Sequence, residues 1–198
     1  ALAAGKDVFC EKPTLTIAEG RALVDAVKQR NAVFQTGLED RSVIQYHMLA
    51  RAVRNGAIGK LKHIDVELPA HTKKYVEDKQ PAPEGLDWNM WLGPAPVAEY
   101  SPQRFDAMGW RMIREYSGRI RTDWGAHIVD TAQVAVFAEK SGPVSVEGKG
   151  TIPEGVMNTA KQTFDLTYTF ANGVTMRVKS GEVALRFEGT DGWCGNKG

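Results

Sequence analysis

Three polar residues, far apart in the chain, are of types that could take a proton from an alcohol while a hydride leaves the same carbon: Lys12, Asp123 and His127. Lys12 follows the mostly apolar run 7–10, which predicts a short buried strand, and Pro13 then restricts the backbone. Ligands of open α/β sheets bind beyond the carboxyl ends of the strands, so a lysine here is placed to meet one. A surface lysine after a core strand is the alternative.

Asp123 and His127 are four residues apart, and on a helix this spacing puts both side chains on one face, with Asp130 close to the same stripe. A carboxylate beside an imidazole can orient the ring and support its charged form, which suits a general base near neutral pH. The alternative is a helix start in which Thr122 and Asp123 form a cap and His127 is packed.

The first part of the chain predicts alternating strands and helices. Thr16 and Glu19 fit a capping box for a helix that runs to about residue 30, and an apolar stripe at helical spacing follows. Residues 32–36 predict a second short strand, and residues 42–55 a second helix. These features indicate part of a doubly wound, Rossmann-type sheet.

The period changes to two over residues 61–68, with one apolar and one mixed face. Residues 69–121 are rich in Pro, Gly, Trp and Tyr and predict long irregular excursions, before a helix over 122–137. Alternating strands follow, with a hairpin turn at Asn172-Gly173. The expected fold class is therefore α/β plus α+β, in which the partial doubly wound sheet precedes a domain with a largely antiparallel, open-faced sheet.

Composition limits the functional classes. The chain has 198 residues, of which 42% are hydrophobic and 25% charged, as in globular proteins. A formal net charge of +1 gives no electrostatic reason to expect nucleic acid as a partner. There is no long apolar run that predicts a membrane span, and the two cysteines and four histidines show no metal-ligand spacing.

Five stretches extend over nearly the whole chain: 4–13, 33–37, 56–61, 85–94 and 122–127. In this order they resemble the Gfo/Idh/MocA family, the oxidoreductases named after glucose–fructose oxidoreductase, inositol dehydrogenase and a rhizopine-catabolism protein. The resemblance implies NAD or NADP as cofactor, and hydride transfer between the nicotinamide and a hydroxyl-bearing carbon of a sugar or polyol.

The resemblance also implies roles for single residues. His127 would be the base, Lys12 would hydrogen-bond the reacting oxygen, and Asp123 would bind a substrate hydroxyl or tune the imidazole. Glu11 and Pro13, together with Lys12, would shape the nicotinamide pocket. The expected substrate contacts are Arg41, Trp110, Arg111 and Tyr116, and for the last three a packing or rim position is the alternative.

Two departures from the family pattern suggest a different substrate range. Residues 37–41 read Gly-Leu-Glu-Asp-Arg where relatives tend to show Gly-Ser-Gln-Gln-Arg, so two acids are added. Arg119 stands where they tend to show glycine.

The family's glycine-rich turn, G-x-G-x-x-G, does not follow a strand in this chain. The expectation is a fragment: residues 1–40 as the C-terminal remnant of a dinucleotide-binding domain, and residues 41–198 as a C-terminally incomplete substrate-binding and oligomerisation domain. The fragment by itself is expected to be inactive. A homo-oligomer is expected through the open sheet face that carries His63, Asp65 and Glu67, with solvent as the alternative.

Two other functions compete with the dehydrogenase. One is a glycosidase that uses bound NAD for transient oxidation, and the other is a truncated, non-catalytic binding or oligomerisation module. A cytoplasmic location is expected, with export as the alternative because a signal peptide would lie before residue 1.

Overall fold

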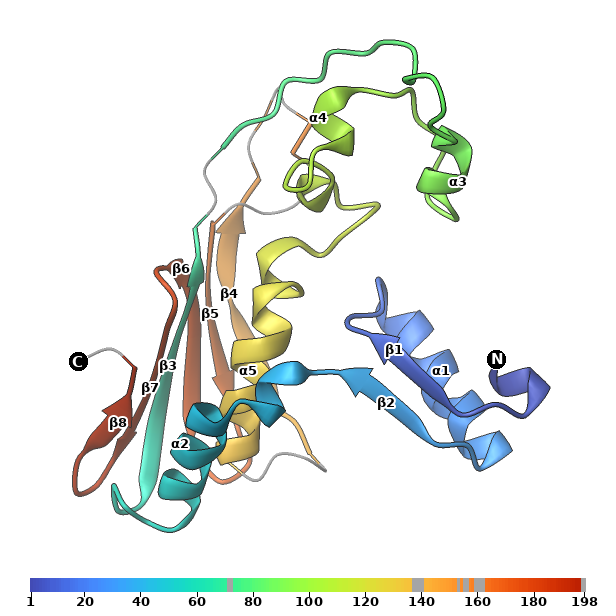
Figure 1. Ribbon diagram of the computed structural model, residues 1–198. Coiled ribbons are helices and arrows are strands. Elements are labelled where there is room, and N and C mark those ends of the chain that lie inside the picture. The colour runs from blue at the N-terminus through green and yellow to red at the C-terminus, as the bar shows by residue number, and fades with distance from the viewer. Residues whose placement is uncertain (71–72, 137–140, 153, 155–156, 159–162, 197–198) are drawn as a thin grey trace.

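The computed structural model describes residues 1–70, 73–136, 141–152, 154, 157–158 and 163–196. The chain forms a small βαβ unit and a larger unit built on a six-stranded sheet, and a short linker joins the two (Figure 1). The expected combination of a doubly wound segment with an α+β unit is confirmed.

The small unit begins with one 3-10 turn and continues as a parallel βαβ. Its elements are η1 (Leu2–Ala4), β1 (Val8–Glu11), α1 (Ile17–Arg30) and β2 (Phe34–Gly37). The predicted capping box is present, because the Thr16 side chain accepts from the Glu19 amide and the Glu19 carboxylate accepts from the Thr16 amide. β1 pairs in parallel with β2 from Val8 opposite Phe34 to Glu11 opposite Gly37.

The prediction that β1 is buried is wrong. Phe9 is 65% exposed and Cys10 is exposed as well. Among the described residues β1 pairs with β2 alone, so only one of its edges is covered by a neighbouring strand. Its apolar composition is that of a strand in a protein core. The described residues, however, leave Phe9 and Cys10 exposed.

A 3-10 turn and a helix lead into the larger unit: η2 (Glu39–Ser42) and α2 (Ile44–Arg54). The six strands that follow in the sheet are β3 (Leu61–Pro69), β4 (Ser145–Thr151), β5 (Thr163–Thr169), β6 (Thr175–Gly181), β7 (Ala184–Gly189) and β8 (Trp193–Gly195). Their order is β4-β5-β6-β3-β7-β8, and β3–β6 is the parallel pair within an otherwise antiparallel arrangement.

Two predictions for this sheet are confirmed. Asn172 and Gly173 form the turn between β5 and β6, where Gly173 has φ 83° and the Asn172 side chain accepts from the Val174 amide. β3 alternates as expected: Ile64, Val66 and Leu68 are fully buried, whereas its other face is partly exposed.

Helices α2 and α5 (Trp124–Ala135) cover one face of the sheet and enclose the hydrophobic core with it (Figure 1). α5 confirms the helix expected over 122–137, whose expected last residue lies outside the described residues. The helix approaches the sheet closely at Gly125, where a Cβ would lie 3.3 Å from Leu68 Cδ1 and 3.5 Å from the main-chain oxygen of Ile120.

The opposite face of the sheet carries cross-strand ion pairs. Arg177 on β6 contacts Asp165 on β5 at 2.7 Å, and Lys179 contacts Glu67 on β3 at 2.9 Å. No helix among the elements of the described chain is long and apolar enough to cross a membrane. The described residues likewise hold no cluster of histidine, cysteine and acidic side chains able to bind a metal ion.

The excursion between β3 and α5 has little regular structure, as predicted. Its described residues form α3 (Trp88–Leu92), α4 (Pro102–Phe105), η3 (Trp110–Met112) and η4 (Arg119–Arg121). Aromatic packing orders it, because the Trp88 and Trp91 rings stack with centroids 4.6 Å apart. Glu77 also contacts Arg104 at 2.7 Å. The folded excursion thus places η3 and η4 next to the start of α5.

Candidate active site

Lys12 lies at the carboxyl end of β1, where its ammonium group reaches across to the larger unit. Its Nζ donates to the main-chain oxygen of Asp123 at 3.1 Å and to Asp123 Oδ1 at 3.0 Å, and its side chain is only 12% exposed. An ammonium group has three N–H donors. Among the described residues Asp123 engages two of them, which leaves the third for a ligand.

Asp123 is the residue before the first turn of α5, and its side chain makes no capping hydrogen bond. Its carboxylate lies between two cations, with Oδ1 on Lys12 and Oδ2 3.3 Å from Arg111 Nε. Asp123 has φ −80° and ψ −82°, outside the helix, and it lines the same cavity as His127. Its position suits holding Lys12.

His127 is in the first turn of α5 and its side chain is 16% exposed. Its Nε2 lies 3.7 Å from Glu39 Oε1, while Nδ1 is buried without a hydrogen-bond partner among the described residues. Because Nδ1 is buried, Nε2 is the ring nitrogen that can meet a ligand. The nearby carboxylate comes from η2 and lies 88 residues earlier in the chain.

Two cavities adjoin at Asp123 and Arg111, which line both. One, of about 570 Å³, is lined by Glu39, Asp40, Tyr46, Met108, Arg111, Asp123, Trp124, His127 and Ile128. The other, of about 360 Å³, is lined by Glu11, Lys12, Pro13, Leu15, Trp110, Arg111, Tyr116, Ser117, Gly118, Thr122 and Asp123. The structure thus brings Lys12 and His127 to neighbouring cavities on one side of the molecule.

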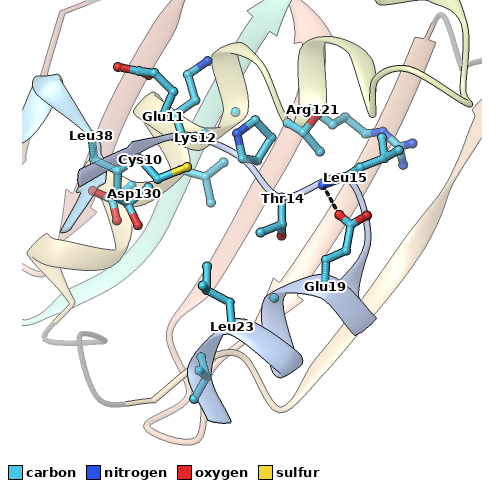
Figure 2. A pocket seen from close by; sticks show the side chains of 18 of the residues that line it. Cys10, Glu11, Lys12, Thr14, Leu15, Glu19, Leu23, Leu38, Arg121 and Asp130 are labelled. Atoms are coloured by element: carbon cyan, nitrogen blue, oxygen red, sulfur yellow. Dashed lines mark hydrogen bonds between the residues drawn. The ribbon is translucent and has the colours of Figure 1, made fainter. Parts of the chain in front are cut away.

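The expected cofactor-pocket residues lie where β1 ends. Glu11, Lys12 and Pro13 line the cavity of about 360 Å³ and also a larger cleft of about 1040 Å³ between the two units. Figure 2 shows this cleft, with Cys10 and Leu23 from the small unit and Arg121 from the larger one around it. The Glu11 carboxylate fills the space beside Gly37, since a Cβ there would lie 2.7 Å from Glu11 Oε1.

Three of the four expected substrate contacts lie together. Trp110, Arg111 and Tyr116 line the same cavity as Lys12, and the Arg111 guanidinium lies over the Trp110 ring at 4.6 Å. The Tyr116 hydroxyl accepts from Arg104 Nη1 at 2.8 Å. Arg41 instead forms a two-pronged ion pair with Asp130, with both N···O distances 2.6 Å, and so ties η2 to α5.

Arg119 lies on η4, just before α5, at the position where a glycine was expected from the family pattern. It has φ 63°, a left-handed conformation that a glycine adopts more easily, and the residue is only 1% exposed. Burial, and then the charge of Arg121, lower the pKa of Arg119 to about 10. The larger side chain therefore packs inside the protein.

Glu39 is the residue near His127 that motif reasoning did not assign. The one available signal was the pair of additional acids at positions 39 and 40. A contact between η2 and the first turn of α5 depends on the packing of the two elements, which local sequence does not specify.

Comparison with known proteins identifies the family. Residues 40–192 match the family described as "Oxidoreductase family, C-terminal alpha/beta domain". The chain therefore belongs to the Gfo/Idh/MocA family of oxidoreductases, which confirms the resemblance found in the sequence.

Three relatives illustrate the similarity. The chain is 24% identical over 199 residues to the 1,5-anhydro-D-fructose reductase of Ensifer adhaerens, which covers 97% of this chain and 50% of that protein. It is 33% identical over 86 residues to the myo-inositol 2-dehydrogenase of Thermotoga maritima, which covers 43% of this chain and 23% of that protein. The chain thus spans at most about half the length of these curated relatives.

The third relative is a solved structure, the WlbA dehydrogenase of Chromobacterium violaceum in complex with NADH and UDP-GlcNAcA. It superposes with a TM-score of 0.67 at 17% identity and covers 98% of this chain and 50% of that one. At this identity the likeness supports the fold.

Proposed function

We propose that this chain is part of a nicotinamide-dependent oxidoreductase that transfers hydride between the cofactor and a hydroxyl-bearing carbon of a sugar or polyol. The observation that carries the proposal is the Lys12–Asp123 pair, which holds an ammonium group at the end of β1 beside the helix that carries His127. A nicotinamide cofactor, NAD or NADP, would supply the hydride acceptor or donor.

The residues at the end of β1 fit such a cofactor. Glu11, Lys12 and Pro13 line both the cleft of about 1040 Å³ and the cavity of about 360 Å³, so a ligand in either space would meet them. We assign residues 1–40 to the dinucleotide-binding domain and residues 41–198 to the substrate-binding domain. The NADH complex of the WlbA relative supports this cofactor class.

Side chains of this chain can accept the proton that leaves the reacting hydroxyl. His127 Nε2 would accept the hydroxyl proton as the carbonyl forms, because this nitrogen faces the cavity of about 570 Å³. The third N–H of Lys12 would donate to the same oxygen and stabilise its developing negative charge. Asp123 would hold Lys12 in place through two hydrogen bonds.

The test uses the complete protein with NAD or NADP and a panel of sugars and polyols. Lys12→Ala and His127→Ala should each lower kcat by about a hundredfold or more, the scale of lost acid–base or electrostatic catalysis. Lys79→Ala and His47→Ala remove the same side-chain types from exposed positions and should leave kcat unchanged. Unchanged rates in the first pair would reject these roles, and release of an aryl leaving group without net NADH would assign a glycosidase instead.

We also propose that two copies of the protein pair through the open face of the sheet. Arg177 pairs with Asp165 and Lys179 with Glu67 within this face, so its two signs of charge balance and a second copy would not be repelled. Light scattering of the complete protein tests this, and a monomeric mass would contradict it.

A further inference from the structure

The cavity beside His127 has an uneven charge distribution. Of its charged lining groups, Asp123 pairs with Arg111 and also with Lys12 from the adjoining cavity, whereas Glu39 and Asp40 add two carboxylates. Tyr46 lines the same cavity, and its burial together with the negative charge of Asp40 raises its pKa. An anionic ligand would be repelled here, and an uncharged one would not.

Glu39 is held in this cavity by the framework around it. Two residues further along η2, Arg41 forms the two-pronged pair with Asp130 on α5. Because Asp130 lies within the same helix as His127, this pair fixes the distance between η2 and the imidazole. The Glu39 side chain itself remains 66% exposed, so its oxygens are accessible to a ligand.

The spacing of two acceptors suits two neighbouring hydroxyl groups. Glu39 Oε1 and His127 Nε2 are 3.7 Å apart, which is longer than a direct hydrogen bond. Neighbouring hydroxyl oxygens on a six-membered ring are about 3 Å apart when gauche, close to the length of one hydrogen bond. One hydroxyl can therefore donate to the imidazole while its neighbour donates to the carboxylate.

We propose that Glu39 is a substrate-binding residue that accepts a hydrogen bond from the hydroxyl next to the reacting one, so that the site selects uncharged vicinal diols. This inference rests on the proposed function, in which His127 receives the proton of the reacting hydroxyl. It adds a requirement that the neighbouring carbon carries a free hydroxyl. It also excludes sugar acids and sugar phosphates whose charge would lie beside Glu39 and Asp40.

The experiment compares two uncharged probes on the complete protein with its cofactor. In myo-inositol every hydroxyl has a neighbour, whereas in cis-1,3,5-cyclohexanetriol none has. Dissociation constants are measured by calorimetry or ligand-observed NMR, and kcat/KM is measured wherever NADH forms. Glu39→Ala should weaken myo-inositol binding about tenfold or more, the scale of a hydrogen bond to a charged group, and should change triol binding less than twofold.

Two further variants complete the design. Glu39→Gln keeps an acceptor oxygen but removes the charge, so it should lose less affinity for myo-inositol than Glu39→Ala and should bind myo-inositol 1-phosphate better than the wild type does. Glu99→Gln removes a carboxylate that is 70% exposed and paired with Lys79, and it should change nothing.

Each outcome has a separate meaning. Equal losses for both probes in Glu39→Ala, tighter binding of the phosphate than of myo-inositol by the wild type, or no binding of myo-inositol at all would each overturn the assignment of Glu39. Glu39-dependent binding of myo-inositol without NADH formation from any polyol would support the diol site while rejecting the proposed hydride transfer.

Discussion

The Lys12–Asp123 ion pair should couple the small unit to the larger one, and a double-mutant cycle can measure that coupling. The pair joins the end of β1 to the residue before α5 through two hydrogen bonds from a single ammonium group. The perturbations are Lys12→Met and Asp123→Asn, alone and combined. Both replacements keep the approximate size of the side chain and remove its charge.

The expected magnitude follows from the exposure of the two side chains, 12% for Lys12 and 26% for Asp123. Exposed ion pairs contribute about 0.2–1 kcal/mol, whereas breaking one partner of a buried pair costs about 3–5 kcal/mol. This pair lies between those limits, so each single change should lower the free energy of unfolding by about 2 kcal/mol. The double variant leaves no unpaired charge in the pair and should cost at least about 1 kcal/mol less than the sum.

Urea unfolding of the 198-residue chain, followed by far-ultraviolet circular dichroism, gives the four free energies. The matched control is the Lys79–Glu99 pair, which is shorter at 2.6 Å but 59% and 70% exposed. Its cycle of Lys79→Met and Glu99→Gln should give no resolvable coupling, because water screens an exposed pair. Additive effects of Lys12→Met and Asp123→Asn, within about 0.5 kcal/mol, would refute the coupling.

Two other predictions concern the excursion that leads to the site. Gly109→Ala would place a Cβ 1.7 Å from the main-chain oxygen of Gln103, so the free energy of unfolding in urea should fall by about 2–3 kcal/mol. Gly142→Ala meets no atom within 4 Å and should change it by less than about 0.5 kcal/mol; similar losses in both would contradict the steric explanation. Burial would raise the pKa of Glu77, but hydrogen bonding and the charge of Arg104 outweigh it and lower that pKa below the ordinary 4.5. Because the pKa is lower in the folded state, the stabilisation from Glu77 is complete above about pH 4.5 and is lost as the pH falls below it. In thermal melts at a series of acid pH values, Glu77→Gln should therefore reduce the fall in melting temperature with pH. The same fall in the variant and the wild type would contradict this.

Local signals in the sequence predicted most of the elements. The capping box at Thr16 and Glu19, the Asn172-Gly173 turn and the alternation of β3 each depend on neighbouring residues, and each is confirmed. The strand order was not predictable in this way. β3 lies between β6 and β7, and such pairing between distant segments is decided by packing.

The site was predicted in part for the same reason. Lys12 and His127 were selected by motif, and the structure brings them to adjoining cavities around Asp123. The partner of the Asp123 carboxylate was not predicted, since Lys12 and Asp123 are 111 positions apart and the segment between them contains the excursion, whose course the sequence leaves open. Arg41 was expected at the substrate, but in the structure its two-pronged partner is Asp130, which lies further along the helix stripe that carries His127.

The close approach of α5 to the sheet at Gly125 depends on a missing methyl group. The helix can sit this low over Leu68 because position 125 has only a hydrogen atom there. His127 follows two residues later, so the height of the helix above the strands also sets the reach of the imidazole. An added Cβ at position 125 would crowd Leu68 Cδ1 and the main-chain oxygen of Ile120, so either the leucine side chain or the helix that carries His127 would have to shift. The packing of the helix that carries His127 therefore depends on a core residue that has no side chain.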